Sequence, residues 1–155
     1  MYQWLVFVHL VGLVLFLLMH GVSMWAVFAV RRDPTPDAAR LLLGLSSRAN
    51  QTMYLGLLLL GIGGLGAAWN ANLLTAGWVV ASYVVLVVVL IGMWAMGAGF
   101  YYPLREALSP KDGSASTIDA AELAQRLDNR RPEGLAIVGL GGLVILVWLM
   151  TLKPF

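Results

Sequence analysis

The sequence contains no cysteine and few charged residues. Among its 155 residues there is no Cys, and only 12% are charged. The absence of Cys excludes disulfides, thiolate metal sites and iron–sulfur clusters. A soluble domain is roughly a quarter charged, whereas 60% of this chain is apolar and its mean hydropathy is +0.82. These values indicate a membrane protein, and the length fits a single membrane domain over residues 1–155.

The charged residues that do occur avoid four long apolar runs. No Lys, Arg, Asp or Glu lies within these runs. A spanning helix needs about 20 mostly apolar residues, and the backbone in lipid must satisfy its hydrogen bonds within the segment. We therefore predict an all-α fold, an integral membrane four-helix bundle. Its spans cover about residues 2–30, 53–69, 77–102 and 134–152.

The basic residues are distributed unevenly between the loops, and this distribution predicts the orientation. Nine of the ten Lys and Arg residues lie in the loops 31–52 and 103–133, and only Lys153 lies elsewhere. Positively charged loops remain on the cytoplasmic side. We therefore expect both loops to be cytoplasmic and both termini to be outside, in a bacterial plasma (inner) membrane. The expected partner is the lipid bilayer, and the absence of a basic stripe argues against nucleic acid.

Each long loop contains a short amphipathic segment. Asp37–Asn50 places its leucines at helical spacing and carries two arginines. Thr117–Asp128 begins with a cap-like Thr and continues as a second helical pattern, preceded by a flexible turn at Ser109–Ser116. We expect two short helices that lie along the cytoplasmic face of the membrane.

Glycines gather in the second and fourth runs. Gly61–Gly66 matches the nucleotide fingerprint G-x-G-x-x-G, but that fingerprint requires a preceding strand and an aqueous helix N-terminus. Inside a membrane helix, clustered glycines instead allow close helix packing. Gly61–Leu65 (GIGGL) is also similar to Gly139–Leu143 (GLGGL), a weak internal repeat that would fit two two-helix halves.

Two histidines, His9 and His20, lie in the first run. An ionisable residue inside a membrane is a functional-site candidate. Their separation of eleven residues is about 20° past three full turns, so they share a face about 16 Å apart. They cannot bind one metal ion together, and each is therefore a separate candidate metal or cofactor ligand. The alternative is that each hydrogen-bonds or packs against a neighbouring helix.

Imidazole is a good axial ligand for haem iron, and helical bundles commonly hold cofactors between facing helices. The second axial ligand would be a Met or a His from another copy of the chain. Met93 and Met96 are favoured, because nearby glycines would let a flat macrocycle approach the third helix. Arg31, at the end of the first run, is a candidate clamp for a haem propionate or a lipid phosphate. Its alternative role is to anchor the helix at the interface.

The start of the chain resembles that of several small bacterial membrane proteins. Trp4–Gly12 (WLVFVHLVG), followed by an apolar helix that ends at Arg31–Arg32, has an early His in a W-x-x-x-x-H-[LI] setting. This group includes an uncharacterised four-helix family, the copper-resistance-D-type proteins and the haem-containing bacterial protoporphyrinogen oxidase. The layout of the chain is most similar to the four-helix family. The resemblance to the oxidase family implies haem b on His9, with a Met partner.

These observations lead to two hypotheses of function. In the first, the protein binds b-type haem for electron transfer or a haem-linked oxidation, with His9 as axial ligand and Met93 or Met96 as its partner. In the second, it is an accessory or structural subunit of a larger membrane complex, with no cofactor of its own. The sequence contains no H-E-x-x-H motif and no carboxylate pair within a span, and it predicts no catalytic residue.

Overall fold

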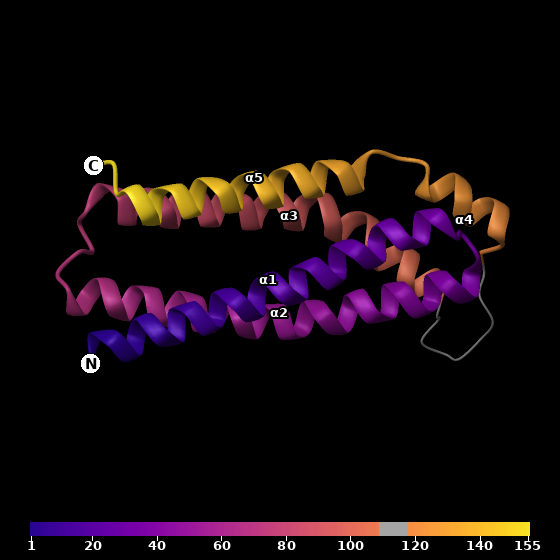
Figure 1. The fold of residues 1–155 in the computed structure, drawn as a ribbon. Coiled ribbons are helices and arrows are strands. Elements are labelled where there is room, and N and C mark those ends of the chain that lie inside the picture. Colours follow the sequence, from indigo (N-terminus) through magenta and orange to yellow (C-terminus); the bar gives the residue numbers. More distant parts are fainter. Residues whose placement is uncertain (109–117) are drawn as a thin grey trace.

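The computed structural model describes residues 1–108 and 118–155, and the regular elements in these ranges are helices. Four of the helices are long and apolar enough to cross a membrane. The predicted all-α architecture with four long apolar helices is therefore confirmed. In chain order the elements are α1 (Tyr2–Arg32), α2 (Pro36–Asn70), α3 (Gly77–Leu108), the short α4 (Ala120–Leu127) and α5 (Arg131–Leu152) (Figure 1).

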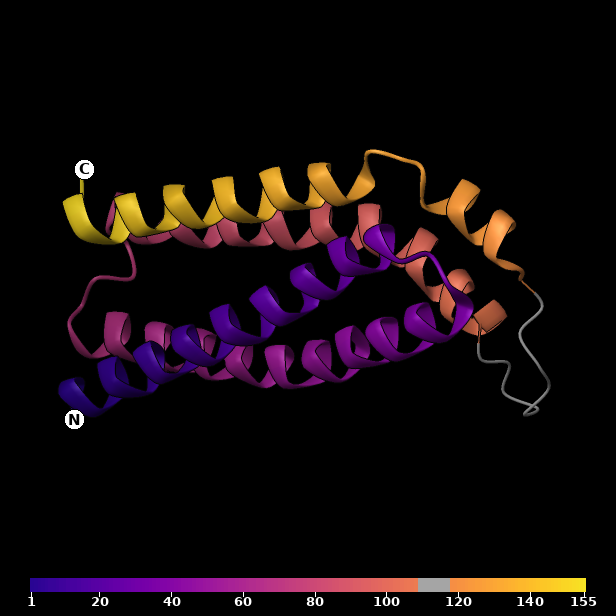
Figure 2. The same ribbon diagram turned by 45° about the vertical axis from the view of Figure 1, so that its right-hand side comes forward.

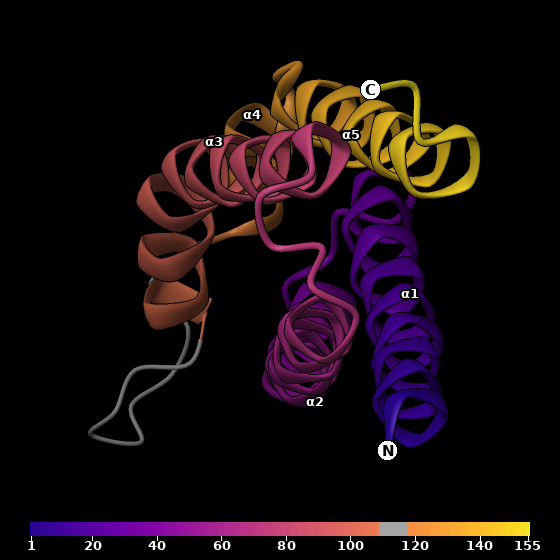
Figure 3. The same cartoon turned by 90° about the vertical axis from the view of Figure 1, so that its left-hand side faces the viewer.

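The long helices form two antiparallel hairpins. α1 packs along α2, and α3 packs along α5 (Figures 1 and 2). Figure 3 looks from the end that carries both chain termini and shows the two hairpins as separate pairs. We call this end the terminal end. The opposite end, which we call the basic end, holds α4 and the α1–α2 loop together with Arg31, Arg40, Arg105, Arg126 and Arg131.

The hydrophobic core lies at the basic end, where all five helices contribute buried side chains. α4 joins it through Leu123 and Leu127, which lie one turn apart on its apolar face. Along the apolar parts of the four long helices, many large apolar side chains are exposed, as is expected of residues that face lipid. The core consists of Val27, Val30, Ala39, Leu43, Tyr101, Leu104, Leu108, Ile118, Leu123, Leu127 and Leu135.

Glycines bring the backbones of α1 and α2 into direct contact. A Cβ atom on Gly56 would lie 2.6 Å from the backbone nitrogen of Phe16, and one on Gly63 would lie 2.5 Å from that of His9. Side chains larger than a hydrogen atom are therefore excluded at these positions. Close approach of this kind supplies the van der Waals contacts that hold helices together in lipid. The predicted role of the α2 glycines in helix packing is confirmed at Gly63.

The predicted short helix over Asp37–Asn50 is wrong as a separate element. These residues are helical, but they form the first half of α2. No Pro or Gly occurs between Asn50 and Met53, so nothing ends the helix before the apolar run begins. α3 likewise continues six residues beyond its predicted end and passes Pro103, which removes a single backbone donor.

The predicted helix over Thr117–Asp128 corresponds to α4, which begins at Ala120. Its N-cap is Asp119, whose carboxylate accepts a hydrogen bond from the backbone N–H of Glu122 at 2.8 Å. Thr117, the predicted cap, and the turn predicted at Ser109–Ser116 lie outside the described residues.

Candidate functional site

His9 joins α1 to α2. Its Nδ1 atom lies 2.8 Å from the carbonyl oxygen of Leu60. Because a carbonyl can only accept, Nδ1 carries the proton and donates it, and Nε2 is left as the acceptor nitrogen. The ring lies over Gly64, where a Cβ atom would be 2.8 Å from Nδ1 and 3.4 Å from the hydroxyl of Tyr83. His9 thus makes the interhelical hydrogen bond that the sequence left open as the alternative to ligand binding.

His20 lies where the two hairpins meet. Its ring stacks on that of Phe16, with centroids 5.7 Å apart and planes 7° from parallel. Its Nε2 atom lies against α5, 3.1 Å from where a Cβ atom of Gly139 would be. Among residues 1–108 and 118–155, neither ring nitrogen of His20 has a hydrogen-bond partner. The nitrogens of this imidazole are therefore not committed to a hydrogen bond within the described chain.

Met93 reaches the same glycine from α3. Its methyl carbon lies 3.6 Å from the position of a Gly139 Cβ atom. Because Gly139 has no side chain, His20 of α1 and Met93 of α3 come together at this position on α5. Met96 lies one turn nearer the basic end, with its sulfur 3.7 Å from a Cβ position at Gly134.

Arg31 is engaged in an ion pair between the hairpins. Its Nη1 atom donates to the carboxylate of Glu133, on α5, at 2.5 Å, and the side chains are 26% and 44% exposed. A solvent-exposed pair contributes about 0–1 kcal/mol to stability, and this pair is partly buried. No sequence motif predicts this pairing, although Glu133 is the acidic residue that immediately precedes the fourth apolar run.

The structure separates His9 from the methionines that the sequence proposed as its partners. His9 and Tyr83 both lie close to Gly64. Met93 follows Tyr83 by ten residues along α3, and it is therefore about 15 Å farther along that helix. The pairing that the arrangement supports within one chain is therefore His20 with Met93. In the described parts of the chain, no group of three His, Cys, Asp or Glu side chains could hold a metal ion. His9 and His20 remain single donors.

Sequence reasoning missed a polar chain that links three helices near the basic end. The hydroxyls of Ser23 on α1 and Ser46 on α2 lie 2.8 Å apart. Arg105 of α3 donates to Ser46 from Nη2 at 3.3 Å. Two serines and an arginine outside any recognisable motif gave no signal in the sequence, because their meeting depends on how the helices pack.

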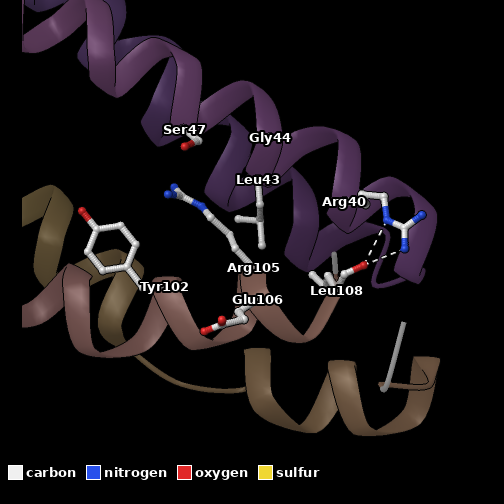
Figure 4. Close-up of a pocket in the computed structure, with 8 residues that line it drawn as sticks. All are labelled: Arg40, Leu43, Gly44, Ser47, Tyr102, Arg105, Glu106 and Leu108. Carbon is white, nitrogen blue, oxygen red and sulfur yellow. Dashed lines mark hydrogen bonds between the residues drawn. The ribbon is translucent and has the colours of Figure 1, made fainter. Parts of the chain in front are cut away.

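A cavity of about 480 Å³ opens beside Arg105, between α2 and the end of α3 (Figure 4). On its other side Arg40 donates from Nε and Nη2 to the carbonyl oxygen of Leu108, at 3.0 and 2.7 Å. These bonds cap the C-terminus of α3, where a positive charge also offsets the helix dipole. The lining residues are Arg40, Leu43, Gly44, Ser47, Tyr102, Arg105, Glu106 and Leu108.

Known proteins give no information about the family or function of this chain. Comparison with protein-family models, with curated proteins and with solved structures found no match. The resemblance based on Trp4–Gly12 therefore stays a prediction, and the function has to be argued from the residues themselves.

Proposed function

We propose that this integral membrane protein binds a b-type haem between its two hairpins, with His20 and Met93 as the axial ligands. The observation that carries the proposal is the convergence of these two side chains on Gly139. An imidazole and a thioether form an axial pair that haem proteins use for electron transfer. His20 takes the role that the sequence assigned to His9, because the Nδ1 atom of His9 is already committed to a helix carbonyl.

The surrounding residues fit a flat, largely apolar group. Gly139 has no side chain, so the imidazole of His20 and the methyl group of Met93 can both lie close to the backbone of α5. Met93 is unbranched and adapts its position readily. Arg31 lies eleven residues after His20 and so near the same face of α1. Its guanidinium has donors beyond the one bound to Glu133, and it is therefore the residue that would pair with a propionate.

The chemistry supplied by a bound haem would be reversible one-electron transfer. The residues of the chain would hold the group, keep water away from it and set its electrostatic surroundings. The apolar runs contain no Asp or Glu, so the predicted spans supply no carboxylate that could relay protons. This composition favours simple electron transfer over a haem-linked oxidation.

We also propose that the basic end faces the cytoplasm of a bacterium and that both termini lie outside its plasma membrane. The support is the gathering of arginines at the basic end, since basic residues are retained on the cytoplasmic side. In this orientation α4 and the first half of α2 would lie at the cytoplasmic surface.

An optical spectrum of the purified protein in mild detergent, before and after dithionite reduction, tests the haem proposal. We expect a sharp reduced α-band of the b type. His20→Ala should abolish it, and Met93→Leu should replace the low-spin spectrum with a high-spin one. His9→Ala and Met96→Leu are the matched controls and should leave the spectrum unchanged.

Two other outcomes of this experiment would change or refute the haem proposal. Full haem content in His20→Ala, with loss in His9→Ala, would return the axial role to His9. A featureless spectrum from cells well supplied with haem would refute haem binding altogether.

A second candidate is an accessory subunit of a larger membrane complex, or a homodimer, with no cofactor of its own. One observation favours it. Among the described residues, Gly61 on α2 and Gly141 on α5 have no atoms beyond their own helix backbone within 4 Å of a Cβ position. Glycines left open on a helix surface are places where another membrane helix can approach closely. A colourless protein that comigrates with a much larger assembly would support this function.

A further inference from the structure

The cavity beside Arg105 is not used by the proposed function. Its volume of about 480 Å³ falls within the usual range of ligand pockets. We propose that it binds a phosphate group, carried either by the headgroup of an anionic lipid or by a free phosphate, with Arg105 as the principal donor. The charges and hydrogen bonds of the lining support this site independently of haem.

Arg105 has more donors than the protein satisfies. Its Nη2 atom bonds to the hydroxyl of Ser46, which Ser23 in turn holds in place. Its Nε atom is buried and has no partner in the part of the chain that the structure describes. In the same part Arg105 has no carboxylate partner. A half-buried guanidinium without an anion is costly, and its planar fork matches the oxygens of a phosphate.

A second guanidinium flanks the cavity from the other side. Arg40 extends from α2, and its two hydrogen bonds to the carbonyl oxygen of Leu108 fix its position at the end of α3. Figure 4 shows Arg40 and Arg105 on opposite sides of Leu43. A group bound between them would meet positive charge from two helices.

The remaining polar lining is compatible with an anion. Ser47 carries a hydroxyl donor, and the ring of Tyr102 lies beside Arg105, with its centroid 5.8 Å from the guanidinium carbon. Glu106 is the one carboxylate among the described lining residues, so two arginines leave a net positive charge. It directly follows Arg105 and therefore leaves α3 about 100° around the helix. In Figure 4 its carboxylate points away from Ser47, toward which Arg105 extends.

The position of the cavity brings it to the level of lipid headgroups. Tyr102, at the predicted end of the third span, lines it and is 56% exposed. Leu41, one residue after Arg40 on α2, is 75% exposed. Aromatic and apolar side chains exposed beside arginines are typical of the membrane interface, where lipid phosphates lie. A lipid headgroup is therefore the first source to test.

Native mass spectrometry of the full chain, released from micelles that contain phosphatidylglycerol, measures whether lipid is retained. We expect Arg105→Gln to weaken retention about fivefold, the effect of one basic residue near a membrane surface. Gly44→Leu should weaken it similarly without removing a charge, because Gly44 lines the cavity and a Cβ there meets nothing within 4 Å in the part of the chain that the structure describes. The control is Arg126→Gln, which removes an arginine paired with Glu122 on α4, outside the cavity.

A parallel arm measures thermal stabilisation of the detergent-purified protein by inorganic phosphate. Stabilisation that depends on Arg105, without selective lipid retention, would assign the site to free phosphate. If Arg105→Gln does not fold, Gly44→Leu is compared with the wild type in both the lipid-retention and the phosphate-stabilisation measurements. Retention and stabilisation that are equal in the wild type, Arg105→Gln and Gly44→Leu would overturn the proposal.

Discussion

Two glycines on α2, only two residues apart, have opposite surroundings. A Cβ atom on Gly63 would collide with the backbone of His9, whereas one on Gly61 would meet none of the described residues within 4 Å. Because the obstacle at Gly63 is backbone rather than a flexible side chain, it cannot move aside cheaply. We expect Gly63→Ala to lower the free energy of unfolding by about 2 kcal/mol, the usual cost of overpacking.

Gly61→Ala is the matched control and should change the stability by less than about 0.5 kcal/mol. Titration with a denaturing detergent, followed by tryptophan fluorescence, measures both variants. Equal loss of stability in the two variants would mean that α1 and α2 do not pack as closely as their backbones indicate.

Composition predicts that glycines pack helices, but it does not predict which glycines do so. The choice depends on how each helix is rotated about its axis, which is set by all of its neighbours together. In the repeat, Gly63 corresponds to Gly141, yet Gly63 is enclosed and Gly141 is open. The same limit applies to the candidate site. Periodicity places His9 and His20 on one face, but only the packing of the hairpins brings His20 to Met93.

At the scale of elements, the four long helices follow from hydropathy, while their ends do not. α2 has 35 residues and is about 52 Å long, well beyond the roughly 30 Å of a hydrocarbon core. The sequence predicts a membrane span in its apolar second half and an amphipathic helix in its first half. Their fusion was not predicted, because a polar stretch such as Asn50–Thr52 can either end a helix or continue it.

The short helix α4 depends on its N-cap. Asp119 satisfies the backbone N–H of Glu122, and the apolar face of α4 then places Leu123 in the core. We expect Asp119→Ala to cost about 1 kcal/mol and to speed amide hydrogen exchange in residues 120–127. Asp128→Ala, at the other end of the same helix, should leave exchange unchanged or slower, since it removes a negative charge from the C-terminus. Faster exchange in both variants would show that the effect is not specific to the N-cap.

At the scale of the molecule, the hairpins are joined mainly at the basic end. The buried cluster there draws residues from all five helices, whereas the ion pair between Arg31 and Glu133 is only partly buried. The predicted bundle is therefore not packed evenly along its length. The two-hairpin arrangement also explains the candidate site, because His20 and Met93 belong to different hairpins and meet where these converge.

Truncating the core should loosen the contact between the hairpins. Leu104 on α3 is 2% exposed and belongs to the buried cluster, so Leu104→Ala should cost about 3 kcal/mol. Leu140→Ala, at a position 57% exposed on α5, is the matched control and should cost less than about 0.5 kcal/mol. Because the chain has no Cys, spin labels on Gln3→Cys and Thr151→Cys can report the distance between the hairpins at the terminal end. Leu104→Ala should broaden that distance distribution, and an unchanged distribution would mean that contacts within the membrane, rather than the core at the basic end, hold the hairpins together.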